Sequence, residues 1–257
     1  MTINFLLIDA LNVIRRVYAA QPGEDSAERA EYAQNSTLQS LQRAVRECKP
    51  THACCVFDSQ EPGWRHDLYA GYKTGRTPMP EVLQQKLSGF KDAFSDFGIP
   101  SIEIPTLEAD DIIATLASKV ASRNGHVIIL STDKIFFQLI SEHITVRDHF
   151  NKQEIDYSYV MDKFGIRPEQ FADLLALSGD STNNISGVPS VGKKTAARLL
   201  SQFDTLDNVL SAAYIIPGKS GDMIRSHSED ARTAQTLVRL RIDLELGLNL
   251  RSFRYGR

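Results

Sequence analysis

The sequence predicts an α/β domain followed by a smaller helical region. In the first part of the chain, short apolar runs typical of strands alternate with amphipathic segments typical of helices, a pattern that indicates a mainly parallel sheet flanked by helices. After about residue 156 the pattern is helical only. The chain has 257 residues, of which 42% are hydrophobic, enough for one large domain or two small ones. We expect an α/β domain over residues 1–155 and a helical region over 156–257.

The first two strands each end in an aspartate. The apolar run NFLLI at residues 4–8 leads into Asp9 and a helical pattern, and after a long helical segment the run THACCVF at residues 51–57 leads into Asp58. A lone aspartate at such a place is more often a helix cap. Ligands, however, bind at the carboxyl ends of parallel strands, so two aspartates in equivalent positions favour one shared crevice. Cys54 and Cys55 are expected to be buried thiols.

The segment at residues 63–80, GWRHDLYAGYKTGRTPMP, breaks the alternation. It interleaves basic side chains such as Arg65, Lys73 and Arg76 with aromatic rings such as Tyr72. Cations neutralise backbone phosphates and rings stack on exposed bases, so the segment is suited to binding nucleic acid. A solvated loop with half-buried rings is the alternative.

The alternation then resumes. A helix is expected from Pro80 to about Gly98, and the run IPSIEI at residues 99–104 reads as a strand. The fourth strand covers residues 126–130 and is followed by Asp133, just beyond a strand end. Residues 144–147 read as a fifth strand, after which the sheet is expected to stop.

Three carboxylates lie at the start of the helix that begins within residues 106–116, TLEADDIIATL. Glu108, Asp110 and Asp111 fall within four residues, where one acid would be an ordinary cap of a helix N-terminus. Three acids repel one another, and a hard divalent cation relieves that repulsion; carboxylate and water oxygens suit Mg²⁺ or Mn²⁺. Taken alone, the cluster leaves capping and metal binding both open.

The helical region contains a pattern typical of a helix–hairpin–helix. In residues 179–200, GDSTNNISGVPSVGKKTAARLL, two glycine-containing turns lead into a basic helix with Lys193, Lys194 and Arg198. Backbone amides at a helix N-terminus hold a phosphate without reading base sequence. The chain ends in RSFRYGR, which reads as a strand or tail.

Composition limits the remaining function classes. The formal net charge of −3 argues against uniform polyanion binding, so contacts with nucleic acid would be local. The N-terminal apolar run is interrupted by polar residues and has no basic region before it, which predicts neither a signal peptide nor a membrane span. The three cysteines form no disulfide framework or zinc-binding spacing. We therefore expect a cytoplasmic protein with no membrane partner.

Together these motifs resemble the structure-specific 5′ nuclease, or flap endonuclease, family. The resemblance covers nearly the full length and rests on an ordered series of segments: LLIDALNVIRR, VFDSQEPGWRHDLYAGYKTGR, EADD, STDK and GDSTNNISGVPSVGKKTA. It implies a PIN-like domain with a helical arch at about residues 63–82 and a C-terminal helix–hairpin–helix (H3TH) subdomain. It also implies a monomer that hydrolyses phosphodiesters at 5′ flaps in DNA, as formed by strand displacement during replication and repair, with Mg²⁺ or, as a substitute, Mn²⁺.

The resemblance assigns metal-binding roles to the acids. The acids that match the family's first site are Asp9, Asp58, Glu108, Asp110 and Asp111. Asp110 is expected to be the main Mg²⁺ ligand, with the others acting largely through water. Of the four acids usual at a second site, Asp133 and Asp180 are present, but Ile135 and Asn183 replace the other two. This departure favours the small stand-alone branch of the family.

Further site residues follow from the same resemblance. Lys73 and Arg76 are expected to assist catalysis together with Asp9 and Asp58, while Arg65 contacts DNA and Tyr72 stacks on a base. The hairpin residues expected to contact DNA are Ser190, Val191, Gly192, Lys193, Lys194 and Thr195. The residues expected to surround a K⁺ ion at the hairpin are Leu177, Ser178, Ser186, Val188 and Val191.

Two rival functions remain at this point. The incomplete second site is compatible with a catalytically weak protein that binds DNA junctions. The acidic α/β pattern is also compatible with a PIN-like ribonuclease, although small ribonucleases of that type usually have neither the basic-aromatic arch nor the hairpin.

Overall fold

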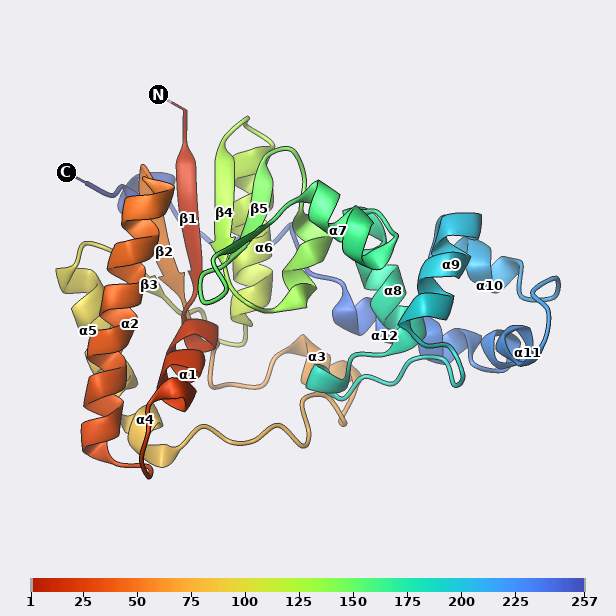
Figure 1. The fold of residues 1–257 in the computed structure, drawn as a ribbon, viewed down its shortest axis with the longest axis horizontal. Coiled ribbons are helices and arrows are strands. Elements are labelled where there is room, and N and C mark those ends of the chain that lie inside the picture. The colour runs from red at the N-terminus through yellow and green to blue at the C-terminus, as the bar shows by residue number, and fades with distance from the viewer. Residues whose placement is uncertain (1, 257) are drawn as a thin grey trace.

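The computed structural model describes residues 2–256, and within them a six-stranded sheet lies between helices, with further helices at one side (Figure 1). The strands are β1 (Asn4–Asp9), β2 (His52–Val56), β3 (Ser101–Ile102), β4 (His126–Leu130), β5 (Ile144–Asp148) and β6 (Gln153–Ile155). Their order in the sheet is β3-β2-β1-β4-β5-β6. The first five run parallel, and β6 pairs antiparallel with β5. The fold is therefore the predicted mainly parallel α/β sheet.

Two details of the predicted sheet are wrong. The sheet does not stop after the fifth strand, because the Asp148 carboxylate accepts hydrogen bonds from the amides of Phe150 and Asn151 and turns the chain back into β6. The third strand has two residues rather than six. Pro100 and Pro105 flank it, and a proline cannot donate a hydrogen bond to a neighbouring strand.

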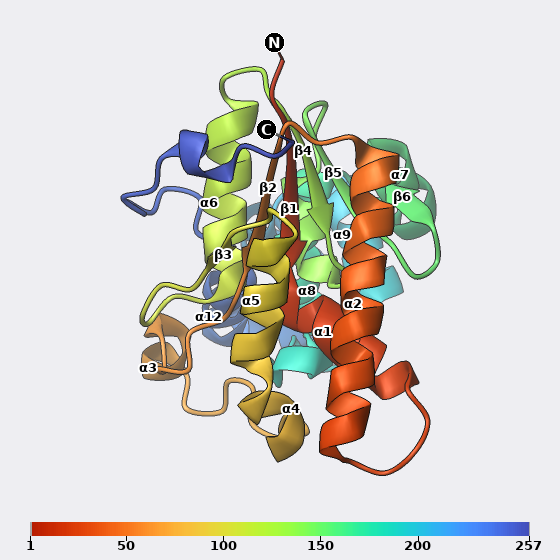
Figure 2. The same cartoon turned by 90° about the vertical axis from the view of Figure 1, so that its left-hand side faces the viewer.

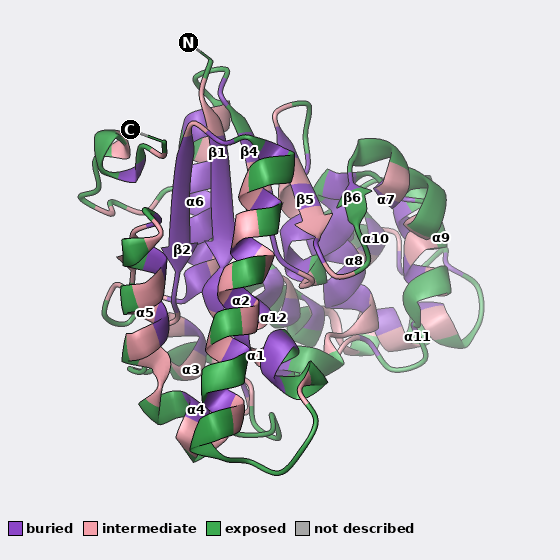
Figure 3. Ribbon diagram, turned by 60° about the vertical axis from the view of Figure 1, so that its left-hand side comes forward, coloured by how far each residue is buried: buried purple, intermediate pink, exposed green. Residues whose placement is uncertain are grey.

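Side chains of the central strands alternate between two apolar cores. On β1, Phe5 and Leu7 belong to one core, and Leu6 and Ile8 belong to the other. The strands are correspondingly buried along their length (Figure 3). Cys54 and Cys55 on β2 point into opposite cores and are both fully buried, which confirms the expectation for these thiols.

Helices cover both faces of the sheet. One core lies under α1 (Ala10–Ala20), α2 (Ala27–Cys48), α4 (Glu81–Gln85) and α5 (Leu87–Asp96). The other core lies under α6 (Ala109–Ala121), which is on the opposite side of the sheet from α2 (Figure 2). The single helix predicted from Pro80 to about Gly98 is thus two helices that meet at Lys86.

The C-terminal helices are arranged around α8. They are α7 (Tyr157–Phe164), α8 (Phe171–Ser178), α9 (Lys193–Phe203), α10 (Leu206–Ser211), α11 (Lys219–Ser226) and α12 (Ser228–Val238). Short 3-10 turns cover Lys134–Leu139, Pro168–Gln170, Ser181–Asn183 and Leu250–Phe253. Residues 171–177 of α8 are all buried, and α8 packs against α9 and α12. The apolar core under α6 continues through these helices.

Two irregular segments complete the fold. The predicted arch contains one short helix, α3 (Trp64–Leu68), followed by irregular chain as far as α4. After α12, residues 239–249 have no helix or strand and run along α6, where Thr115 and Lys119 donate hydrogen bonds to the carbonyls of Arg241 and Leu244. At the C-terminal end, Phe253 stacks on Phe5 with ring centroids 5.6 Å apart.

None of the helices within residues 2–256 is long and apolar enough to cross a membrane.

Candidate active site and nucleic-acid interface

Four aspartates from separate segments lie at the carboxyl edge of the sheet. Asp9 is the last residue of β1, and Asp58 and Asp133 follow β2 and β4. Asp110 lies in the first turn of α6, whose start is held at this edge because the Asp58 carboxylate accepts a hydrogen bond of 2.8 Å from the Ala109 amide. The structure therefore brings together Asp9, Asp58, Asp110 and Asp133, as expected from strand ends that share one edge.

Burial and neighbouring negative charges raise the pKa of three of these carboxylates. Burial, and then the charge of Asp58, raise the pKa of Asp9 to about 7. Burial, and then the charges of Asp133 and Asp9, raise the pKa of Asp110 well above its usual value. Burial also raises the pKa of Asp133, to which the charge of Asp180 adds. Such a group of anions is stabilised by a cation.

The donor set fits a hard divalent ion held partly through water. All four side chains offer carboxylate oxygens, which Mg²⁺ and Mn²⁺ prefer, and Mg²⁺ commonly keeps several of its waters. Within residues 2–256, no three acidic, histidine or cysteine side chains are grouped closely enough to hold one ion by themselves. The arrangement therefore fits an ion with few direct protein ligands.

Ser131 supports this site, and the sequence analysis did not identify it. Its hydroxyl donates a hydrogen bond of 2.8 Å to Asp9 and accepts one of 3.0 Å from the Asp133 amide, so it links two of the four aspartates. The position of Ser131, directly after a strand and two residues before Asp133, was the available signal.

The other two acids of the cluster point into a buried network around Arg65. The Arg65 guanidinium donates two parallel hydrogen bonds of 2.8 Å to Asp111 and one of 2.6 Å to Glu108. Asp111 also accepts hydrogen bonds of 3.0 Å from the Trp64 indole and from the Arg241 amide. Arg65 is 2% exposed and Asp111 is fully buried. The expectations that Asp111 ligates a metal and that Arg65 contacts DNA are therefore not supported, because the hydrogen-bonding groups of these two side chains are already paired with each other.

Tyr72 and Lys73 contact Glu108 from the arch. The Tyr72 hydroxyl donates a hydrogen bond of 3.1 Å to Glu108, and the ring is 4% exposed, so it is not available to stack on a base as expected. Lys73 forms an ion pair of 2.5 Å with Glu108. Burial lowers the pKa of Lys73, but the charges of Asp58, Glu108 and Asp110 outweigh this effect and raise the pKa. Glu108 thus holds a positively charged lysine beside the aspartates, and it is not positioned as a free metal ligand.

Protein contacts occupy the places where the family usually has two further acids. The Asn183 amide accepts a hydrogen bond of 2.6 Å from Arg76 and donates one of 2.6 Å to Asp180. Ile135 is 6% exposed and belongs to the apolar core. Asp180 and Asp133 nevertheless line a common groove of about 780 Å³, to which Lys193 also contributes. Asn183 therefore joins the arch to the hairpin, whereas Ile135 packs in the core.

The hairpin presents main-chain groups and basic side chains to this groove. Gly179 and Gly187 let two backbone segments approach closely, since a Cβ on Gly187 would lie 2.6 Å from the Leu177 carbonyl oxygen. Helix α9 begins after Gly192 without a side-chain cap among the described residues, so its first-turn amides are available to an anion. Lys193 and Lys194 in that turn are exposed, and Val191 is buried, so Val191 can contact a phosphate only through its backbone.

Family models match the chain in two consecutive parts. Residues 4–165 match the 5′-3′ exonuclease N-terminal resolvase-like domain. Residues 166–257 match the 5′-3′ exonuclease C-terminal SAM fold.

Full-length relatives and solved structures agree with these matches. The chain is 42% identical to Flap endonuclease Xni of Tolumonas auensis over 98% of both chains, and 42% identical to Flap endonuclease Xni of Photobacterium profundum over 99% of this chain and 98% of the relative. The fold is similar to that of T5 5′-exonuclease with bound divalent zinc ions, with a TM-score of 0.75, 22% identity, and coverage of 91% and 89%. It is also similar to the catalytic core of Rad2 in complex with DNA substrate, with a TM-score of 0.59, 14% identity, and coverage of 94% and 80%.

Replacing Arg65 with alanine is expected to lower the free energy of unfolding by about 3–5 kcal/mol, because it leaves the Asp111 charge buried without its partner. Urea unfolding followed by circular dichroism measures the change. The matched control is Arg232→Ala, which removes an arginine from an exposed ion pair with Asp207 and should cost less than about 1 kcal/mol. Equal losses in the two variants would contradict a structural role for the Arg65 network.

Proposed function

The chain belongs to the 5′-3′ exonuclease family and to its flap endonuclease branch, and we propose that it cuts 5′ flaps in DNA with Mg²⁺ held at the carboxyl edge of the sheet. It is a structure-specific 5′ nuclease whose family uses divalent metal ions. The observation that carries the proposal is the group of four aspartates beside a groove that the hairpin also lines.

Asp110 is the main metal ligand in this proposal. It faces Asp9, Asp58 and Asp133, and no side-chain or backbone donor within residues 2–256 forms a hydrogen bond with its carboxylate. Asp9, Asp58 and Asp133 would hold waters of the ion, and Mn²⁺ would fit the same oxygen donors. A bound Mg²⁺ would stabilise negative charge that develops on the phosphate and would make a bound water more acidic.

The arch lysine and arginine complement the aspartates. Lys73 keeps its proton because carboxylates surround it, so it offers a positive charge to a phosphate oxygen at the cleavage position. Arg76 lies at the edge of the groove, bonded to Asn183 and to the Thr182 carbonyl, and it orients the strand that enters there. Glu108 acts through Lys73, as a positioning residue.

The hairpin binds the duplex beside the flap. The first-turn amides of α9, with Lys193 and Lys194, contact phosphates, which explains binding that does not depend on base sequence. The carbonyl groups near Gly179 and Gly187 would bind K⁺ between the hairpin and a phosphate; they belong to Leu177, Ser178, Ser186, Val188 and Val191. The close backbone approach at the two glycines supports this cation site.

The division at residue 155, the monomeric state and the cytoplasmic location remain proposals. A division into a catalytic part, 1–155, and a DNA-binding part, 156–257, is supported by the position of the aspartates in the first and the hairpin in the second. The rival function, junction binding with little turnover, is favoured by one observation, which is that Ile135 and Asn183 occupy second-site positions.

Replacing Asp110 with alanine should abolish flap cleavage and leave the fold intact. It should also abolish the rise in melting temperature that Mg²⁺ is expected to cause in the wild type, since an ion that binds only the folded state stabilises it. The assay compares a 5′-flap duplex with blunt duplex DNA and single-stranded RNA, and circular dichroism checks the fold.

Near wild-type cleavage by the Asp110 variant would remove Asp110 from the site. A wild type that binds the flap without cutting it would establish the junction-binding rival. Preference for RNA would overturn both functions.

Replacing Lys193 and Lys194 together with alanine should weaken duplex binding without moving the cleavage position. For two lost phosphate contacts, the slope of log K against log salt should become shallower by about 1.8. The control is Arg123→Ala, an exposed residue between α6 and β4, at the opposite edge of the sheet. An unchanged slope in the double lysine variant would place both residues outside the interface.

Replacing Ile135 and Asn183 together with aspartate should lower the Mg²⁺ concentration needed for half-maximal flap cleavage, because two anionic ligands are added beside Asp133 and Asp180. The same change should lower the melting temperature without Mg²⁺, since it places a charge at a core position and removes the Arg76–Asn183–Asp180 hydrogen bonds. A magnesium titration and paired thermal melts separate these effects, and an unaltered Mg²⁺ requirement would mean that no second ion binds there.

A further inference from the structure

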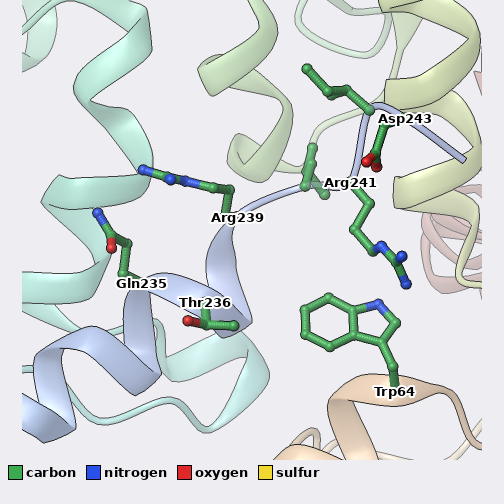
Figure 4. A pocket seen from close by; sticks show the side chains of 8 residues that line it. Trp64, Gln235, Thr236, Arg239, Arg241 and Asp243 are labelled. Carbon is green, nitrogen blue, oxygen red and sulfur yellow. The ribbon is translucent and has the colours of Figure 1, made fainter.

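A pocket of about 530 Å³ lies between α3 and the end of α12, outside the site described above. Its wall is formed by Trp64 on one side and by the chain from Gln235 to Asp243 on the other (Figure 4). This volume is within the range of sites that bind small organic groups. Leu240 and Ile242 contribute apolar surface, and Ile242 is 49% exposed.

The chemistry of the pocket suits a nucleotide. Trp64 is partly exposed and offers its indole ring to the pocket. The Arg241 guanidinium approaches the same ring to 5.9 Å and points toward it (Figure 4). An aromatic ring next to an arginine can stack a base and neutralise its phosphate. Asp243 is the acid at the rim, and the exposed Arg239 side chain, which also lines the pocket, pairs with Asp173.

Trp64 is rigidly placed for this role. Its indole nitrogen donates a hydrogen bond to Asp111, and the buried Arg65 lies 4.4 Å from its ring. These contacts fix the ring before any ligand arrives, so binding does not have to order it.

The pocket lies next to the carboxyl edge of the sheet, but it is on a different side of the first turn of α6 from the four aspartates. Asp110 faces Asp9, Asp58 and Asp133, whereas its neighbour Asp111 faces Trp64 and Arg65. A strand that leaves the aspartates and passes around this turn would cover about 10 Å, the width of a helix.

We infer that this pocket holds a base of the single-stranded 5′ flap, a few nucleotides beyond the cleavage position. The base stacks on Trp64, and Arg241 contacts the adjoining phosphate. The inference rests on the proposed function, since it names a place for the strand that the nuclease cuts. It makes the enzyme sensitive to flap length, because a flap too short to reach Trp64 gains nothing from the pocket.

The experiment uses the chain's single tryptophan as its probe. Since Trp64 is the only tryptophan in the sequence, quenching of tryptophan fluorescence reports stacking in this pocket directly. The protein is titrated, with chelator present to prevent cleavage, with duplexes that carry a flap of about ten nucleotides, a flap of about one, or no flap. The long flap is expected to quench the fluorescence, and the other two duplexes are not.

Arg241→Gln tests the phosphate contact while keeping the probe. Arg241 uses only its backbone amide and carbonyl in hydrogen bonds to α6, so the fold should be preserved. The KM for the long flap should rise severalfold, the KM for the short flap should not change, and the salt slope for a single strand should become shallower by about 0.7. Arg123→Gln is the matched control.

The outcomes separate the pocket from the proposed function. Absence of quenching, equal quenching by long and short flaps, or an unchanged KM in the Arg241 variant would each overturn the pocket, even if flap cleavage is intact. Conversely, a wild type that cuts no flap would overturn the proposed function, and quenching by a single-stranded oligonucleotide would still support a binding site at Trp64.

Discussion

The buried ion pair of Arg65 with Asp111 is the contact on which the site depends. Arg65 belongs to the arch, Asp111 to the first turn of α6, and the carbonyls of Leu237 and Arg239, which also accept hydrogen bonds from Arg65, belong to the end of α12. One side chain therefore holds three distant parts of the chain together. Because Asp110 is the next residue to Asp111, its direction toward the other aspartates is set by this pair, and the arch cannot move away from α6 without exposing an unpaired charge.

The carboxyl edge is built at a cost to the stability of the folded protein. Burial and nearby carboxylates raise the pKa of Asp9, Asp110 and Asp133, which favours the unfolded chain, where these groups are far apart and solvated. Natural proteins commonly accept such local destabilisation at functional sites. Asn183 and Ile135 reduce this repulsion, since an amide that bridges Arg76 and Asp180 and an apolar side chain in the core replace two further anions. The chain has gained internal contacts where an acid would have given another metal ligand.

The sequence predicted the sheet and the location of the aspartates, but not the direction of every side chain. Strand ends can be read from apolar runs, and strand ends share an edge, so Asp9, Asp58 and Asp133 were placed together by a general property of parallel sheets. The sequence pattern could not reveal the roles of Arg65 and Tyr72. A basic or aromatic residue in an irregular segment suits either DNA or a buried partner, and the partners of Arg65 include groups 172 and 174 positions away. Whether a side chain is buried against partners so far away in the sequence depends on tertiary packing alone.

The irregular segment of residues 239–249, which runs along α6, has a consequence for how the candidate site forms during folding. Arg241 bonds to Asp111 and Thr115 through its backbone, and its neighbours supply the last acceptors for Arg65. Contacts between residues 126 and 130 positions apart form slowly, because the intervening chain must first be ordered. Asp111 therefore acquires all of its partners only after residues 239–249 have packed along α6, so the candidate site is completed late in folding.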